Sequence, residues 1–335
     1  MKISASIYSN KSKSLVDLVK ELDNISVDML HIDCNDDLAV FDDILKIREI
    51  TDLPIDLHII TSNPENFYAK LKEVYVEYVT FQYENVGKPF KIPSDIKSKK
   101  GISIVTKTNL DVLKGLTTDF DFFLLMTTTP GQSGGNFDKQ NFKIIRQCKS
   151  LFPSTPIHVD GGVNNEVAFV LRNMGVSAVV SGSYLVNAEG IGKALHNLRK
   201  PTTQSHTLVE DIMIERNELP VLKQEEINLK AVLQKIEEFK LGFLLVEDYK
   251  QTLVGVITNA DVRKALIKNI NDLNNVTAVD LINTKPAKTG NYNSITEMLI
   301  YLETLPFSAL FLPVVDTNKT LVGAVTFTNL IKGAL

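Results

Sequence analysis

The stretch Pro156-Ile157-His158-Val159-Asp160-Gly161-Gly162-Val163 contains the pattern that decides the fold of the first 200 residues. A short β-type run ends in a carboxylate, two glycines follow, and a helical pattern starts at Asn165. A strand that leads through a tight turn into a helix is the building unit of parallel α/β sheets. The pattern therefore predicts a fold made of repeated β/α units.

Eight such β-type runs occur before residue 200, and helical patterns separate most of them. The predicted strands are Lys2–Tyr8, Val27–Ile32, Pro54–Ile59, Tyr78–Gln82, Gly101–Val105, Phe120–Met126, Pro156–Asp160 and Ala178–Ser181. The predicted helices are Ser14–Leu22, Ala39–Arg48, Pro64–Leu71, Asp138–Lys149, Asn165–Met174 and Ile191–Leu198. The count of eight, with polar and glycine residues just past the strand ends, predicts an α/β fold, a closed (β/α)₈ TIM barrel over residues 1–200. A doubly wound open sheet is the alternative.

Residues 201–206 contain no large apolar side chain and are predicted to form a linker. Beyond this linker the chain repeats itself, because the strand-like stretch Phe243–Thr258 recurs 68 residues later as Phe311–Thr326. Each copy is predicted to contain a helix, two strands around a tight turn and a second helix. Since one copy buries little apolar surface, two copies are expected to pack together as one α+β domain. The boundaries predicted for the domain are 207–335, with copies at 207–270 and 274–335, and the leading helices are Leu229–Phe239 and Ile295–Leu305.

The composition of the 335-residue chain limits the partners that it can attract. A net charge of −4 gives no general electrostatic attraction to nucleic acid or to an anionic membrane. The two cysteines, Cys34 and Cys148, are too few for a disulfide framework and fit a reducing compartment. No apolar run approaches the roughly 18–20 residues of a membrane span, and the N-terminus lacks a signal-peptide pattern. We therefore expect a cytoplasmic protein with no nucleic-acid or membrane partner.

Four potential metal ligands stand at the carboxyl ends of the predicted strands, where β/α barrels place their active sites. His31 and Asp33 share one face of the second strand, His58 ends the third strand, and Asp160 ends the seventh. Two imidazoles and two carboxylates form a donor set suited to Zn²⁺, or to Mn²⁺, Fe²⁺ or Co²⁺. A single histidine at a strand end is more often a structural hydrogen-bonding group, so the combination carries the prediction.

Glycine-rich turns follow the last three predicted strands. Asp160-Gly161-Gly162 and Ser181-Gly182-Ser183 each lie between a strand and a helix, where backbone N–H groups and the helix dipole favour an anion. Loops after strands seven and eight are a frequent phosphate site in barrels, although tight turns alone also require glycine. A third loop, Thr129-Pro130-Gly131-Gln132-Ser133-Gly134-Gly135-Asn136, is a candidate lid.

Six short motifs carry a resemblance that spans nearly the whole predicted barrel. They are Ala5-Ser6-Ile7, His31-Ile32-Asp33 with Asp36, Asp56-Leu57-His58, Leu124-Leu125-Met126 with Pro130-Gly131, Val159-Asp160-Gly161-Gly162-Val163, and Gly182-Ser183. In these motifs residues 1–200 resemble the ribulose-phosphate 3-epimerase family, which inverts C3 of phosphorylated ketoses. The resemblance implies a divalent metal bound by His31, Asp33, His58 and Asp160, with Asp33 and Asp160 as the proton-transfer groups. It also implies a substrate site formed by Ser6, His58, Gly131, Gly134, Gly135, Gly161, Gly162, Gly182 and Ser183.

The expected chemistry agrees with the predicted geometry. Epimerisation removes a proton from one face of a carbon beside a carbonyl and returns a proton to the other face. Carboxylates on strands two and seven, on nearly opposite walls of the barrel, can do this, while a metal stabilises the enediolate between the steps. The expected function is a metal-dependent 3-epimerase of a ketose phosphate, either D-ribulose 5-phosphate/D-xylulose 5-phosphate or a related sugar phosphate.

Departures from the family pattern leave the identity of the sugar open. Gln82 stands where the family has a histidine, and Ile59-Ile60 replace the usual Leu-Met after His58. The sixth loop differs at Gln132, Ser133 and Gly135, and His158, expected one layer below Asp160, replaces a residue that is commonly glutamate. A hexulose or heptulose phosphate of surface-polysaccharide biosynthesis is therefore an alternative substrate.

The repeated domain resembles a tandem pair of CBS modules. The motifs are Gly255-Val256-Ile257-Thr258-x-x-Asp261 and Gly323-Ala324-Val325-Thr326-x-x-Asn329. The resemblance implies that Thr258, Asp261 and Thr326 bind the ribose of an adenine nucleotide, with a weaker or empty second site because Asn329 is not a carboxylate. It also implies a homo-oligomer, a dimer or larger. A dimerisation module without a ligand is the alternative.

Two other functions compete with an epimerase. A non-catalytic barrel that senses a sugar phosphate need keep none of the four potential ligands, yet all four are present. Decarboxylases of related phosphate-binding barrels use Asp-x-Lys-x-x-Asp at a strand end, whereas Asp33-Cys34-Asn35-Asp36 contains no lysine. Decarboxylation is therefore disfavoured.

Overall fold

The structure is a computed structural model, and its described residues form two compact units, one within Met1–Gln204 and one within Ser205–Thr328. The described residues are 1–87, 90–116, 119–132, 134–200 and 206–327. Most of the predicted linker and the last helix predicted for the second repeat copy lie outside them.

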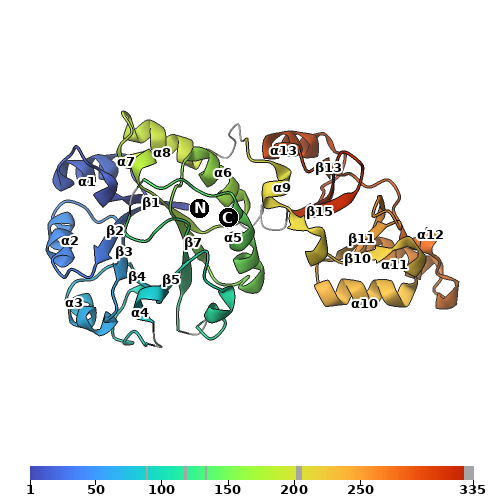
Figure 1. Ribbon diagram of the computed structural model, residues 1–335, viewed down its shortest axis with the longest axis horizontal. Helices are drawn as coiled ribbons and strands as arrows, with labels where there is room; N and C mark the ends of the chain where they lie inside the picture. Colours follow the sequence, from blue (N-terminus) through green and yellow to red (C-terminus); the bar gives the residue numbers. More distant parts are fainter. Residues whose placement is uncertain (88–89, 117–118, 133, 201–205, 328–335) are drawn as a thin grey trace. The chain divides into compact units, whose positions relative to one another are not determined.

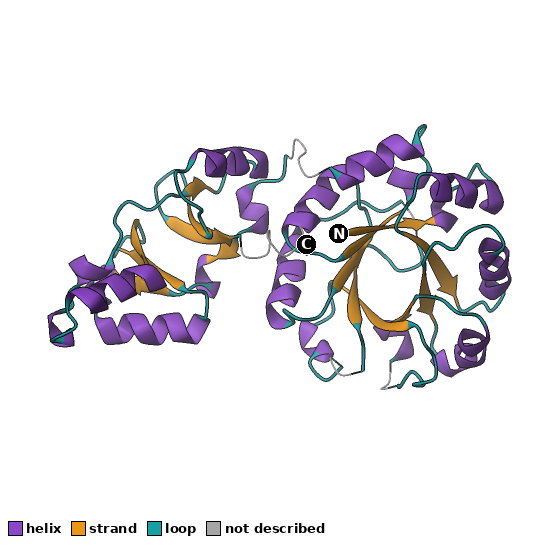
Figure 2. Ribbon diagram, turned by 180° about the vertical axis from the view of Figure 1, so that it is seen from behind, coloured by secondary structure: helices purple, strands orange, loops and turns teal. Residues whose placement is uncertain are grey.

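The first unit is a closed barrel of eight parallel strands, which confirms the predicted fold and excludes the open sheet. Strand β1 pairs with β2 on one side and with β8 on the other, so no strand is left at an edge. The strands form the inner ring and the helices lie outside it (Figures 1 and 2). The strands are β1 (Lys2–Ser6), β2 (Met29–Asn35), β3 (Ile55–Ile60), β4 (Tyr78–Gln82), β5 (Lys99–Val105), β6 (Phe122–Met126), β7 (Ile157–Asp160) and β8 (Ala178–Ser181). The α-helices are α1 (Leu15–Asn24), α2 (Val40–Arg48), α3 (Tyr68–Glu73), α4 (Tyr83–Val86), α5 (Gln140–Leu151), α6 (Asn165–Asn173), α7 (Ser183–Val186) and α8 (Ile191–Arg199).

The element boundaries differ from the predicted ones where local turns intervene. Strand β1 ends at Ser6 because Ile7–Ser9 form a 3₁₀ turn, while β2 continues to Asn35. The predicted helix Pro64–Leu71 divides into a 3₁₀ turn, Pro64–Phe67, and α3. Between β4 and β5 the described residues contain only the one-turn helix α4, in agreement with the absence of a predicted helix there.

An aromatic layer fills the barrel below its carboxyl-end mouth. Tyr78 and Phe122 are buried, and the His158 ring stacks on Phe122 at a centroid distance of 4.4 Å. His158 therefore lies one layer below Asp160, as the alternation of side chains along β7 requires. Gly101 accommodates this layer, because a Cβ there would lie 2.4 Å from Cζ of Phe122. The layer gives the polar mouth of the barrel a packed floor.

The second unit contains two small sheets, ordered β10-β11-β12 and β13-β14-β15-β9. Its strands are β9 (Ile214–Glu215), β10 (Val221–Lys223), β11 (Phe243–Glu247), β12 (Leu253–Thr258), β13 (Thr289–Gly290), β14 (Phe311–Val315) and β15 (Leu321–Thr326). Its α-helices are α9 (Val209–Ile212), α10 (Leu229–Phe239), α11 (Asn259–Lys268), α12 (Ala278–Leu281) and α13 (Ile295–Thr304).

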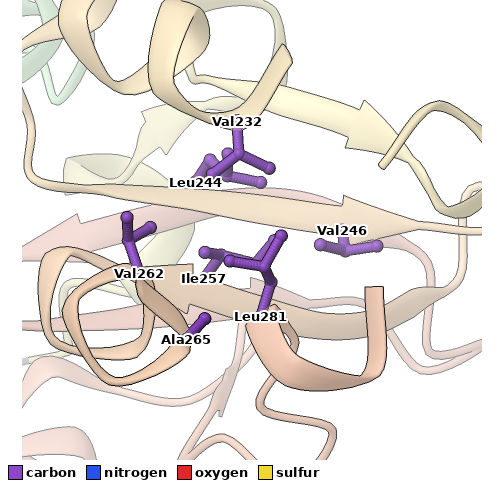
Figure 3. Close-up of a cluster of buried hydrophobic side chains, with 7 residues drawn as sticks. All are labelled: Val232, Leu244, Val246, Ile257, Val262, Ala265 and Leu281. Carbon is purple, nitrogen blue, oxygen red and sulfur yellow. The ribbon is translucent and has the colours of Figure 1, made fainter. Parts of the chain in front are cut away.

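The internal repeat is visible in the backbone of this unit. The β11–β12 pair has a register shift after Val246, and the β14–β15 pair has the same irregularity after Val314, 68 residues later. Apolar side chains from α10, the β11–β12 pair, α11 and α12 form a buried cluster (Figure 3). The rings of Phe243 and Phe311, equivalent residues of the two copies, stack at 3.8 Å, so the copies pack on each other as the repeat predicts.

Candidate active site and metal centre

Four side chains converge at the carboxyl-end mouth of the barrel, and they are the four that the sequence singles out. One ligand atom from each of His31, Asp33, His58 and Asp160 lies within 4.8 Å of the others. Asp33 on β2 is in register with His58 on β3, which puts both side chains at the same level. The Nδ1 atom of His58 lies 3.2 Å from Oδ1 of Asp33, and Nε2 of His31 lies 3.6 Å from Oδ2 of Asp160.

Buried acceptors hold the opposite nitrogen of each imidazole. His31 places Nδ1 2.9 Å from Oδ2 of Asp56, and this oxygen also accepts a hydrogen bond from the Ser4 hydroxyl. His58 places Nε2 2.9 Å from Oε1 of Gln82. Such outer partners fix the orientation and the tautomer of histidine ligands. Sequence reasoning did not assign this role to Asp56 or to Gln82. For Asp56, one signal was present in the sequence: it lies two residues before His58 on β3 and therefore on the same face of the strand.

The donor arrangement fits a divalent metal. A neutral imidazole has one N–H, and in both histidines a buried acceptor takes it. The other nitrogen of each ring lies 3.2–3.4 Å from the same carboxylate oxygen, Oδ1 of Asp33, inside the cluster. A cation between these atoms satisfies all of them, and two nitrogens with two carboxylates suit Zn²⁺ or a similar ion.

The two carboxylates of the cluster have different environments. Burial raises the pKa of Asp160 to about 6, against the opposing effect of His31. Burial would also raise the pKa of Asp33, but His31 and His58 outweigh it and hold that pKa well below the ordinary value. Burial opposes the charged form of His31, yet Asp56 and Asp33 raise its pKa above the ordinary value. Asp33 thus favours the ionised form, and Asp160 is the better proton carrier.

A pocket of about 340 Å³ opens beside the two carboxylates. It is lined by the predicted residues Ser6, Asp33, Gly131, Gly134, Gly135, Asp160, Gly161, Gly162, Gly182 and Ser183. Predicted His58 is not in the lining, because its side chain is fully buried. The lining also includes Gln132 and Asn136 of the candidate lid, and the polar residues Ser9, Thr128, Asn164 and Tyr184, which were not predicted. Among the described lining residues none is lysine or arginine.

Close approaches by neighbouring atoms explain two glycines of the pocket wall. Gly162 has φ +65°, and a Cβ there would lie 2.3 Å from the backbone nitrogen of Phe137. A Cβ on Gly182 would lie 2.6 Å from Oγ of Ser9, whose hydroxyl is 3.0 Å from that of Ser6. The positive φ and the backbone neighbour therefore require glycine at position 162, whereas at position 182 the close neighbour is a side-chain hydroxyl. Ser133 of the candidate lid lies outside the described residues.

In the second unit, the predicted ribose-binding side chains Thr258 and Asp261 bind each other. The Thr258 hydroxyl donates to Oδ2 of Asp261 at 2.6 Å, and the Thr258 backbone N–H donates to the same oxygen at 3.0 Å. The pair forms the capping box that begins α11. Thr326 ends β15 opposite Phe311, and Asn329 lies outside the described residues.

Comparison with known proteins identifies the barrel. Residues 2–186 match the ribulose-phosphate 3 epimerase family. The chain belongs to this family. It is 31% identical over 218 residues to ribulose-phosphate 3-epimerase of Methanocaldococcus jannaschii, covering 61% of this chain and 92% of the relative. It is 25% identical over 213 residues to the Bacillus subtilis ribulose-phosphate 3-epimerase, covering 59% of this chain and 98% of that enzyme.

Residues 209–268 of this epimerase-family chain match the CBS domain. The solved CBS-pair protein CBSX2 from Arabidopsis thaliana is 28% identical, covering 38% of this chain and 94% of that chain with a TM-score of 0.33. The two family matches and the epimerase relatives confirm the resemblances seen in the sequence: the chain is an isomerase of the epimerase type joined to a CBS region. Within the described ranges, every helix is too short or too polar to cross a bilayer.

Proposed function

We propose that the chain is a metal-dependent 3-epimerase of a ketose phosphate, with D-ribulose 5-phosphate and D-xylulose 5-phosphate as the first candidates. The observation that carries the proposal is the convergence of Asp33 and Asp160 with His31 and His58 beside an open pocket. The two carboxylates come from β2 and β7, which are separate parts of the barrel wall. They can therefore approach a bound carbon from two sides.

In this mechanism one carboxylate removes the C3 proton and the other returns a proton to the opposite face. Asp33, ionised and held by the two histidines, is the base for one epimer. Asp160, on β7, delivers the proton to the other face, and the roles reverse for the other epimer. A divalent ion held by His31, Asp33, His58 and Asp160 would supply positive charge for the developing oxyanion.

Phosphate binding is assigned to the glycine loops after β7 and β8. Gly161, Gly162, Gly182 and Ser183 line the pocket at the starts of the segments that lead into α6 and α7. Backbone N–H groups suit an anion where the described lining has no lysine or arginine. The hydroxyl of Ser6 is assigned to the sugar, and the loop that contains Gly131, Gly134 and Gly135 to closure over it.

The experiment is exchange of the C3 proton with solvent deuterium, screened over ketose phosphates of five to seven carbons. We expect metal-dependent incorporation of one deuterium at C3 of the true substrate, and formation of its epimer. Exchange only with a six- or seven-carbon ketose phosphate would correct the sugar and keep the chemistry. No exchange with any of them, in protein loaded with Zn²⁺, Mn²⁺, Fe²⁺ or Co²⁺, would contradict the proposal.

For the second unit we propose an adenine-nucleotide site at Thr258 and Asp261, together with assembly of the chain into a homo-oligomer, a dimer or larger. The pair lies at the end of β12, and its hydroxyl and carboxylate are the groups that bind ribose hydroxyls. The alternative is a module that only dimerises. Free and buried Cys34 and Cys148 support a cytoplasmic location for the enzyme.

A further inference from the structure

Gln82, at the end of β4, is fully buried and lies directly behind the metal cluster. Its side-chain oxygen Oε1 lies 2.9 Å from Nε2 of His58. The same oxygen accepts a hydrogen bond of 2.7 Å from the hydroxyl of Ser103, which is also fully buried on β5. Two buried groups therefore converge on one end of this amide.

The other end of the amide determines its orientation. The Nε2 atom of Gln82 donates to a carboxylate oxygen of Glu84, on the following helix α4. The second oxygen of Glu84 accepts from the backbone N–H of Val105 at 3.0 Å and from the hydroxyl of Thr108. A carboxylate can only accept, so the NH₂ group must face Glu84 and the oxygen must face His58. A reversed amide would set its oxygen against the carboxylate.

This orientation has a consequence for His58. An amide oxygen accepts only, so Nε2 of His58 must be the nitrogen that carries the proton. The lone pair of the neutral ring is then on Nδ1, which lies 3.2 Å from Oδ1 of Asp33 inside the metal cluster. His58 therefore presents the lone pair of Nδ1 to the cluster, and this is the tautomer that can bind a metal ion through Nδ1.

We propose that Gln82, oriented by Glu84, is a positioning residue that fixes His58 in the Nε2–H tautomer and directs Nδ1 to the metal. The role rests on the metal centre of the proposed function but does not depend on which sugar is used. His31 provides the comparison within the same cluster, because a carboxylate, Asp56, holds its outer nitrogen instead of an amide. Removing the amide should therefore release one histidine and leave the other in place.

The first test records the tautomers of the full-length, metal-free protein by ¹⁵N NMR of labelled histidine. We expect His58 as the Nε2–H form and His31 with its Nδ1 proton retained. In Gln82→Leu, His58 should lose its single tautomer while the His31 signals stay unchanged. A wild-type His58 in the Nδ1–H form would overturn the proposal, and this result needs no variant and no activity.

The second test measures metal affinity by competition between the protein and a chromophoric chelator for Zn²⁺ and Co²⁺. Gln82→Leu should weaken binding by roughly 10–100-fold, the usual cost of losing an outer partner of a ligand. Ser103→Ala removes the other buried partner of Oε1, keeps the acceptor towards His58, and should retain the Nε2–H tautomer and most of the affinity. An unchanged dissociation constant and an unchanged Co²⁺ absorption spectrum in a folded Gln82→Leu protein would overturn the proposal. Failure of the sugar screen alone would leave these readouts intact, so the two proposals fail separately.

Discussion

The barrel and the second unit each contain a polar cluster at strand ends, but the polar atoms are used differently. In the barrel, His31 and His58 donate outward to Asp56 and Gln82, so their inner nitrogens remain available beside Asp33 and Asp160. In the second unit, the hydroxyl and carboxylate of Thr258 and Asp261 bind each other and cap α11.

The barrel cluster is therefore preorganised for a ligand, whereas the polar groups of Thr258 and Asp261 already stabilise the start of α11. In the barrel cluster, two imidazole nitrogens and two carboxylates converge on one point, so a cation there meets ligand atoms that are already in place. The capping pair is satisfied without any ligand, so binding there must exchange one set of hydrogen bonds for another. The comparison therefore predicts strong effects for changes in the barrel cluster and weaker effects for changes in the second unit.

The largest expected effect is the loss of all epimerisation when a chelator removes the metal. Return of activity on adding Zn²⁺, Mn²⁺, Fe²⁺ or Co²⁺, followed by a coupled assay of epimer formation, checks it and names the metal. Nucleotide binding by the second unit, measured in the same chelated sample, should not change. Full activity in protein shown to be free of metal would contradict the proposed centre.

Asp33→Asn is expected to lower kcat by about 10²–10⁴-fold, the usual contribution of a positioned proton-transfer group. Assays at saturating metal, with the metal content of each protein measured, separate proton transfer from metal loss. Asp37→Asn makes the same change of charge at an exposed position near the end of the same strand and should retain activity. Equal losses in both variants would show that charge alone, rather than the site, is responsible.

Gly182→Ala is expected to raise KM for the phosphorylated sugar by about tenfold, with a smaller change in kcat. The added Cβ would lie 2.6 Å from Oγ of Ser9 and must displace the pocket wall, which acts on binding rather than on proton transfer. One lost hydrogen bond to a charged group gives a change of about this size. Gly192→Ala, where the new Cβ meets only Cγ2 of Ile25 at 3.6 Å, is the matched control. A fall in kcat alone would argue against the phosphate assignment.

The smallest expected effect on catalysis is that of Thr258→Ala with Asp261→Ala. Loss of the capping box should cost the second unit about 1 kcal/mol and abolish adenine-nucleotide binding in calorimetry, with basal epimerisation unchanged. Ser294→Ala with Glu297→Ala removes an equivalent capping box from α13 and controls for stability. Nucleotide binding that survives in the first double variant would place the ligand elsewhere, and equal loss in both would assign it to stability.

The sequence predicted the barrel because each strand-turn-helix unit carries its own local pattern, and eight of them can close. It predicted His31, Asp33, His58 and Asp160 because each of them stands at the carboxyl end of a predicted strand. The face of the strand on which each lies follows from alternation along that strand. The roles of Asp56 and Gln82 depend on which side chain of a neighbouring strand lies opposite, and no single strand contains that information.

Short or ambiguous signals account for the rest. Strands β9, β10 and β13 contain two or three residues, too few to show alternation, so none was predicted. The spacing of Thr258 and Asp261 is typical of a capping box and is also the motif of the CBS resemblance. A capping box and a ribose-binding motif use the same two side chains, so the sequence cannot distinguish them. The structure shows that the capping hydrogen bonds form.

The two-carboxylate mechanism is tested most directly by deuterium exchange in two variants, Asp33→Asn and Asp160→Asn, each loaded with metal and offered both purified epimers. Each variant retains one of the two carboxylates. We predict that each rapidly exchanges the C3 proton of only one epimer, a different epimer in each case, and that each interconverts the two at least about 10²-fold more slowly than the wild type. Exchange of the same epimer by both variants, or continued epimerisation by either at the wild-type rate, would contradict the assignment of Asp33 and Asp160 to opposite faces.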